Sequence, residues 1–114
     1  MIKIKIPSTV SLAKKAGKLV HGEDNVKNAI RSGAAALVII ALDTGANTSK
    51  SITDSCAYYN IKYVSAGTKE ELGHCVGKSF TAAVAICDEG FAKSIEKEVR
   101  GISSGTILET ILKA

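Results

Sequence analysis

Ala36-Leu37-Val38-Ile39-Ile40-Ala41-Leu42 decides the fold, because this stretch is apolar at every position. It is too short for an ordinary capped helix and is rich in β-branched residues, so it indicates a strand covered on both faces. Residues 82–87 have the same character and predict a second buried strand. Strands of this kind need helices on both sides of their sheet.

Helical segments alternate with these strands along the rest of the chain. Gly17, Gly33, Asn60 and Gly77 are typical helix ends. Thr68 and Glu71 have the spacing of a capping box. Shorter strands are expected at residues 19–20 and 63–65, and helices at about 7–16, 22–33, up to 60, 68–77 and from 88 onward. The alternation predicts an α/β fold, a three-layer α/β/α sandwich with a four-stranded sheet.

Length and composition favour one globular domain, since the chain has 114 residues, of which 46% are hydrophobic. We expect this domain to span residues 1–101. Residues 102–114 are expected to form an amphipathic C-terminal helix with an apolar stripe of Ile107, Leu108, Ile111 and Leu112. That stripe is expected to pack on the domain, and contact with a partner is the alternative.

The remaining composition bears on location and partners. The formal charge of +4 permits nucleic-acid binding without proving it. The three cysteines, an odd number without CxxC spacing, argue against a disulfide framework or a zinc site. No apolar run approaches the roughly 18–20 residues that span a membrane, and the N-terminus lacks a signal-peptide stretch. We therefore expect a cytoplasmic protein without membrane contact, and a monomer is favoured.

No pattern in the sequence points to an active site. His21 and His74 have no carboxylate or cysteine at a catalytic or metal-ligand spacing, and each is expected to be partly buried. The GxSxG, GxGxxG and GxxxxGK[ST] motifs are absent. We expect no enzyme activity, no cofactor, no metal and no small-molecule substrate.

Two regions have the chemistry of a nucleic-acid contact. The first, within residues 18–31, combines a helix start that can offer backbone donors to phosphate, asparagines that can contact base edges, and basic residues. Its candidate residues are Lys18, Gly22, Glu23, Asp24, Asn25, Lys27, Asn28 and Arg31. Of these, Asp24, Asn25, Lys27, Asn28 and Arg31 are expected on the exposed side of the helix. An ordinary solvated helix face is the alternative.

The second region is the loop Gly77-Lys78-Ser79-Phe80-Thr81. An aromatic residue at a loop tip can stack on an unpaired RNA base, and a lysine beside it can contact phosphate. The candidate residues are Lys78, Ser79, Phe80 and Thr81. The alternative is that Phe80 packs into the core.

Several segments, in their order and spacing, resemble one family. They are Leu12-Ala13-Lys14-Lys15-Ala16-Gly17-Lys18-Leu19-Val20, Gly22-Glu23-Asp24, Ala29-Ile30-Arg31-Ser32-Gly33, Leu37-Val38-Ile39-Ile40-Ala41, Thr53-Asp54-Ser55-Cys56, Tyr58-Tyr59-Asn60, Gly67-Thr68-Lys69-Glu70-Glu71-Leu72-Gly73-His74, Gly77-Lys78 and Ala83-Val84-Ala85-Ile86. The chain resembles the ribosomal protein L-seven-Ae and L-thirty-e superfamily, in particular its small bacterial YlxQ-like members.

The resemblance implies an L-thirty-e-like sandwich with a mixed sheet and binding of kink-turn RNA, a duplex sharply bent at an internal loop. It places the RNA on the start of the second helix and on the loop before the last strand, which are the two regions above. The implied partner is structured RNA, with ribosomal RNA as one candidate, in a ribosome- or translation-associated protein. A protein-interaction module on the same fold, using the C-terminal stripe, is the alternative function.

The second helix departs from the family pattern. RNA-binding relatives typically carry Asn-Glu-x-x-Lys, whereas the matching positions here are Asp24, Asn25 and Asn28, with a lysine displaced to Lys27. An aspartate near phosphates is unfavourable, and the loss of lysine at position 28 removes a charge contact. We therefore expect weaker RNA binding or a target that differs from the standard bend.

Overall fold

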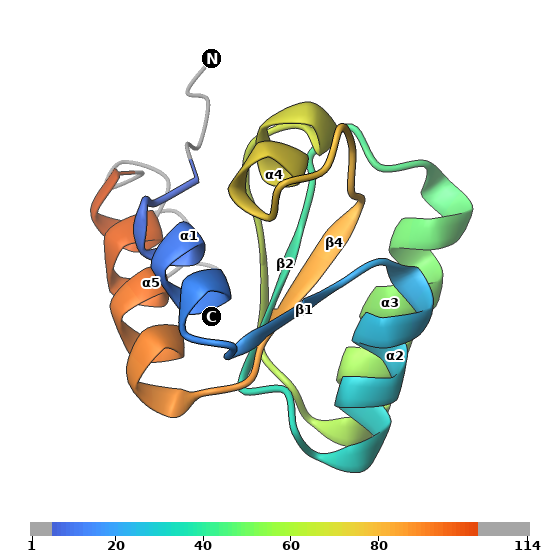
Figure 1. Ribbon diagram of the computed structural model, residues 1–114. Helices are drawn as coiled ribbons and strands as arrows, with labels where there is room; N and C mark the ends of the chain where they lie inside the picture. The colour runs from blue at the N-terminus through green and yellow to red at the C-terminus, as the bar shows by residue number, and fades with distance from the viewer. Residues whose placement is uncertain (1–5, 103–114) are drawn as a thin grey trace.

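A four-stranded mixed sheet lies at the centre of the computed structural model, which describes the backbone of residues 6–102 and the side chains of residues 6–99 (Figure 1). Its strands are β1 (Leu19–His21), β2 (Leu37–Ile40), β3 (Tyr63–Ser65) and β4 (Ala83–Ile86), in the order β1-β4-β2-β3. The central strand β4 is antiparallel to β1 and β2, and β2 is parallel to β3. The expected mixed sheet is therefore confirmed.

Helices cover both faces of the sheet (Figure 1). One face carries α1 (Thr9–Lys15), α4 (Lys69–Cys75) and α5 (Glu89–Ile102), and the other carries α2 (Glu23–Ser32) and α3 (Ala46–Tyr59). Along β2, Leu37 and Ile39 contribute to the first core, and Val38 and Ile40 contribute to the second. A strand with apolar contacts on both faces must be apolar at every position, which explains the opening stretch of sequence.

The helix ends follow local rules that the sequence predicts. Asn60 closes α3 in a left-handed conformation, at φ 58°, which asparagine tolerates better than most residues. At the start of α4, the Thr68 hydroxyl accepts from the Glu71 amide, and the Glu71 carboxylate accepts from the Thr68 amide. At the start of α5, the Asp88 carboxylate accepts from the Phe91 amide. The capping box expected for Thr68 and Glu71 at the start of α4 is therefore present.

Several details differ from expectation. His74 is exposed, because it lies on the outer side of α4, while His21 is partly buried as expected. Cys56 is buried, and burial raises the pKa of its thiol to about 11, whereas Cys75 and Cys87 are only half-buried. All three cysteines are free thiols.

The C-terminal segment lies largely outside the described residues. Helix α5 continues through Ile102, so that residue belongs to the preceding helix and does not begin a separate one. The apolar stripe at 107–112 falls beyond this point. Within residues 6–102, no helix is long and apolar enough to cross a membrane.

Candidate nucleic-acid interface

The two regions expected to contact nucleic acid lie at the same end of the sheet. The antiparallel register pairs His21, the last residue of β1, with Val84 near the start of β4. The Gly22 amide then donates to the Ala83 carbonyl across 3.1 Å. Because β1 leads into α2 and the loop of residues 77–82 leads into β4, the start of α2 and this loop are neighbours.

The start of α2 depends on the conformation of Gly22. This residue has φ +92° and ψ 147°, and a Cβ added to it would meet nothing within 4 Å. Glycine is therefore favoured here because any other residue would be strained at this positive φ, although there is room for a side chain. No side chain caps the helix start, while Glu23 and Asp24 place negative charge in the first turn. These carboxylates interact favourably with the positive end of the helix dipole, and they would repel a phosphate bound at the helix start.

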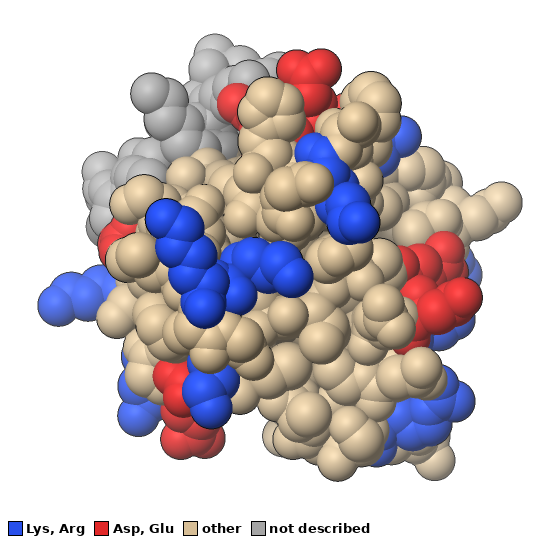
Figure 2. Space-filling model, viewed as in Figure 1, with Lys and Arg blue, Asp and Glu red and all other residues tan. Residues whose placement is uncertain are grey.

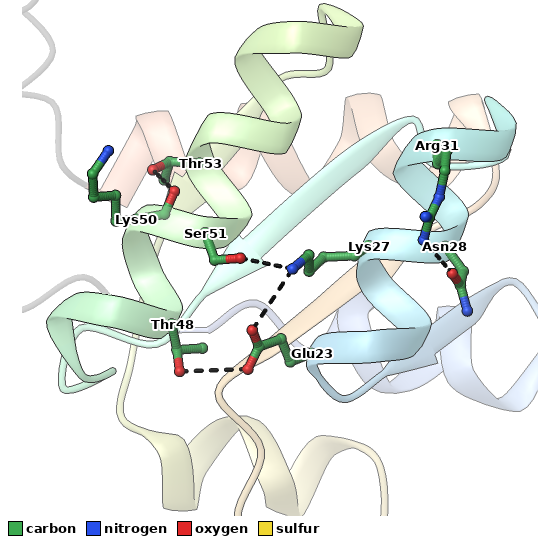
Figure 3. Close-up of polar contacts among 8 residues, drawn as sticks. All are labelled: Glu23, Lys27, Asn28, Arg31, Thr48, Lys50, Ser51 and Thr53. Atoms are coloured by element: carbon green, nitrogen blue, oxygen red, sulfur yellow. Dashed lines mark hydrogen bonds and ion pairs between the residues drawn. The ribbon is translucent and has the colours of Figure 1, made fainter.

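The side of α2 that faces α3 carries a polar network (Figure 3). The Lys27 ammonium donates to the Ser51 hydroxyl at 2.7 Å and lies 4.0 Å from the Glu23 carboxylate. The Thr48 hydroxyl donates to the other Glu23 oxygen at 3.4 Å. The prediction that Lys27 lies on the exposed side of the helix is therefore wrong. Lys27 flanks the buried stripe on the α3 side, and a third of its side chain remains exposed.

The outward side of α2 carries the other polar candidates. Asp24, Asn25, Asn28 and Arg31 are all exposed. The Arg31 guanidinium donates to the Asn28 amide oxygen one helical turn earlier (Figure 3). The Asn25 amide group donates to the His21 carbonyl at 3.1 Å, which links the helix to the end of β1. Arg31 is thus the one candidate cation of α2 that faces solvent.

The loop of residues 77–82 packs against α4 and projects an aromatic ring. The Lys78 amide donates to the Gly73 carbonyl at 2.8 Å. A Cβ on Gly73 would lie 2.8 Å from the Phe80 backbone nitrogen, so glycine permits this close approach. Phe80 is 65% exposed, which contradicts the alternative in which it packs into the core. Lys78 and Ser79 are exposed beside it.

Thr81 and Lys18 do not share this exposed surface. Thr81 is buried, its hydroxyl donates to the Ala83 carbonyl at 3.2 Å, and its amide donates to the Lys69 carbonyl. These two hydrogen bonds therefore hold the loop to α4 and to the start of β4. Lys18 precedes β1, and its carbonyl accepts from the Cys87 amide, so its backbone lies at the opposite end of the strand from Gly22.

Two basic groups that no sequence motif marked as candidates, His21 and Lys14, lie close to each other. Partial burial lowers the pKa of His21, and the nearby charges of Lys14 and Lys78 lower it further. Lys14 of α1 and Lys78 of the loop before β4 thus lie close enough to His21, at the end of β1, to disfavour a further positive charge there. Figure 2 shows Lys and Arg side chains gathered over α1 on this face of the molecule. Lys14 lies on α1, so only the tertiary structure shows that it is near His21.

The described residues offer no site for a metal ion. Between Ile6 and the end of α5, no group of three or more His, Cys, Asp and Glu side chains is placed to hold one. Two cavities in this part of the chain adjoin α5 and the link between α3 and β3. The surface at the start of α2 is open and carries amides, cations and an exposed ring, which suits an extended polyanion with unpaired bases.

Comparison with known proteins places this arrangement in a family. The family model described as "Ribosomal protein L7Ae/L30e/S12e/Gadd45 family" matches residues 4–96. The RNA-binding protein YlxQ of Bacillus subtilis is 40% identical over 86 residues, which are 75% of this chain and 86% of that protein. The large ribosomal subunit protein eL30 of Methanosarcina mazei is 33% identical over 78% of this chain and 84% of its own length.

A solved structure supports the fold independently. The 15.5kD RNA binding protein of Giardia lamblia superimposes with a TM-score of 0.72, at 23% identity, over 83% of this chain and 84% of that chain. The chain therefore belongs to the ribosomal protein L7Ae/L30e/S12e/Gadd45 family. The resemblance noted in the sequence, including its YlxQ-like character, is confirmed. The named relatives are ribosomal or RNA-binding proteins, so the expectation of a non-enzymatic protein is also confirmed.

Proposed function

We propose that this protein binds structured RNA of the kink-turn or internal-loop type, using the start of α2 and the loop of residues 77–82 as one surface. The observation that carries the proposal is the Gly22–Ala83 hydrogen bond, which joins the two segments at one end of the sheet. Relatives described as RNA-binding proteins support RNA as the partner.

The chemistry of the surface suits a bent duplex with unpaired nucleotides. Lys78 and Lys14 can neutralise phosphates near the α2 start, and Arg31, in the last turn of α2, can neutralise a phosphate farther along the helix. Phe80 can stack on a base that the bend has freed from its neighbours. A plain duplex offers the phosphates without the unpaired bases, so the proposed surface favours the bent RNA.

In this proposal, the acidic first turn of α2 weakens the binding of RNA phosphates. Glu23 faces α3 and is partly neutralised by Lys27, whereas Asp24 is exposed. The Asp24 carboxylate therefore lowers the affinity for phosphate at the helix start. We further propose a cytoplasmic, translation-associated role for a monomer, with ribosomal RNA as one candidate target.

A gel-shift titration tests the proposal. The full chain is titrated into a standard kink-turn RNA and, at the same salt concentration, into an unbent duplex of equal length and base composition. The proposal predicts tighter binding of the kink-turn RNA and a steep loss of affinity with salt. Equal affinity for the two RNAs would contradict the bent-RNA preference, and a flat salt response would contradict the basic surface.

A further inference from the structure

A second surface, at the opposite end of the sheet, combines exposed tyrosines with lysines. All three tyrosines of the chain lie within residues 58–63, at the end of α3 and the start of β3. Tyr58 is 82% exposed, Tyr63 is 47% exposed and Tyr59 is 41% exposed. Exposed aromatic rings gathered in this way are typical of a surface that receives a partner.

The strand register places this surface far from the start of α2. Tyr63, the first residue of β3, pairs with Val38 near the start of β2, whereas Ser65 pairs with Ile40 at the other end. Ile40 in turn pairs with Ala83, beside Gly22. The tyrosines and the RNA surface proposed above therefore lie at opposite ends of the sheet.

The Tyr58 and Tyr59 rings are in contact with each other and remain exposed to solvent. The Tyr58 and Tyr59 rings meet edge to face, with centroids 4.8 Å apart and planes at 76°. This contact limits the orientations of the Tyr58 ring while most of its surface stays in solvent. Val64 packs against the core shared with α5, so Tyr63, its neighbour on β3, belongs to the face covered by α2 and α3.

A lysine-lined groove lies on the α5 side of the edge strand β3, on the other face of the sheet from Tyr63. Lys62 directly precedes Tyr63, and with Lys93 and Lys97 of α5 it lines a groove of about 340 Å³. Glu96 lies in the same groove, 3.7 Å from the Lys62 ammonium, so the groove's lysines outnumber its carboxylate. The Lys62 side chain is 72% exposed despite this ion pair.

We propose that the tyrosines 58, 59 and 63 and this groove bind an unpaired RNA segment, with bases on the rings and phosphates on the lysines. Proteins bind single strands without sequence preference by this pairing of aromatic platforms with a basic groove. The tyrosines alone would suit a protein partner as well, and the lysines favour RNA, because lysine is depleted at protein–protein interfaces whereas tyrosine is enriched. The inference rests on RNA being the partner of this protein, and it does not depend on the kink-turn preference.

The test compares three RNAs at one salt concentration: a kink-turn, the same kink-turn with an unpaired uridine tail of roughly ten nucleotides, and the tail alone. The tail should tighten binding of the kink-turn about ten-fold. Tyr58→Ala should remove that gain and leave affinity for the untailed RNA unchanged. Tyr58→Phe should keep the gain, because the ring is retained.

Lys93→Ala and Lys97→Ala should each reduce the salt dependence of tail binding by close to one contact. Lys50→Ala serves as the matched control, because Lys50 is an exposed lysine of α3 paired with Asp54 and lies outside the groove. A tail that adds nothing to binding, or a gain that survives Tyr58→Ala, would overturn the inference.

Two further outcomes separate this inference from the proposed function. Tyr58-dependent binding of the tail alone, without preference for the kink-turn, would support the tyrosine surface and contradict the kink-turn proposal. Concentration-dependent self-association in sedimentation, lost in Tyr58→Ala and unaffected by the tail, would show that the surface binds a second copy and would overturn the RNA assignment.

Discussion

Replacing Phe80 by alanine should weaken RNA binding strongly while leaving the fold intact. About a third of this side chain is buried, because 65% of it is exposed. Full burial of a phenylalanine contributes about 1.5–3 kcal/mol, so truncation here should cost on the order of 0.5–1 kcal/mol of folding stability. Stacking of one base on an aromatic ring contributes about 1–3 kcal/mol, which is roughly a five-fold to hundred-fold change in affinity.

Fluorescence anisotropy with a labelled kink-turn RNA measures the loss of affinity, and thermal unfolding of the free protein measures the stability. Leu12→Ala is the matched control, because Leu12 is an apolar side chain of α1 that is 53% exposed. The control should change affinity little. The reasoning is refuted if Phe80→Ala binds RNA as tightly as the unchanged protein, or if it unfolds where the Leu12→Ala variant does not.

Three further predictions concern α2 and the end of β1. Asn28→Lys should tighten RNA binding and steepen its salt dependence by close to one contact, and Asp24→Asn should act in the same direction; no effect from either change would mean that the RNA lies elsewhere. Arg31→Ala should weaken RNA binding, whereas Lys27→Ala should mainly lower the melting temperature, because the Lys27 ammonium donates to Ser51 in α3. Both variants are measured in an RNA-binding assay and a melting assay. A larger loss of RNA affinity in Lys27→Ala, with a larger loss of melting temperature in Arg31→Ala, would contradict the placement of Lys27 toward α3 and of Arg31 toward solvent. The pKa of His21 is lowered from 6.5 in the folded protein, so its contribution to folding stability should be fully present above pH 6.5 and should be lost as the pH falls below 6.5 and through the lowered pKa. Bound phosphate should raise this pKa, so RNA binding should tighten as the pH falls, and an NMR titration of the His21 ring with and without RNA tests both signs.

The architecture could be predicted from local patterns because each pattern has one dominant cause. An unbroken apolar stretch at residues 36–42 requires cover on both faces of a strand, and the structure supplies two helical layers there. Thr68 and Glu71 cap α4 through groups only three residues apart, so neither depends on the rest of the fold. Glycine and asparagine at helix ends are equally local signals.

The details of the candidate site depend on contacts between distant segments, and the sequence pattern could not supply them. Lys27 and Arg31 both belong to the polar part of α2, but Ser51 on α3 determines that only Lys27 turns inward. Thr81 is a predicted contact residue, yet it is buried and its hydroxyl donates to the Ala83 carbonyl at the start of β4. Lys14 lies near His21 because α1 packs beside β1, and the helical pattern of α1 alone does not show this.

Amide chemical-shift mapping tests the central claim most directly. The ¹⁵N-labelled protein is titrated with kink-turn RNA, and every backbone amide serves as a probe of its own surroundings. The account predicts the largest changes in two segments at once, Gly22 to Asn25 at the start of α2 and Lys78 to Phe80 in the loop before β4. Changes in only one of these segments, or changes centred elsewhere on the sheet, would contradict the claim that the two segments form a single RNA-binding surface.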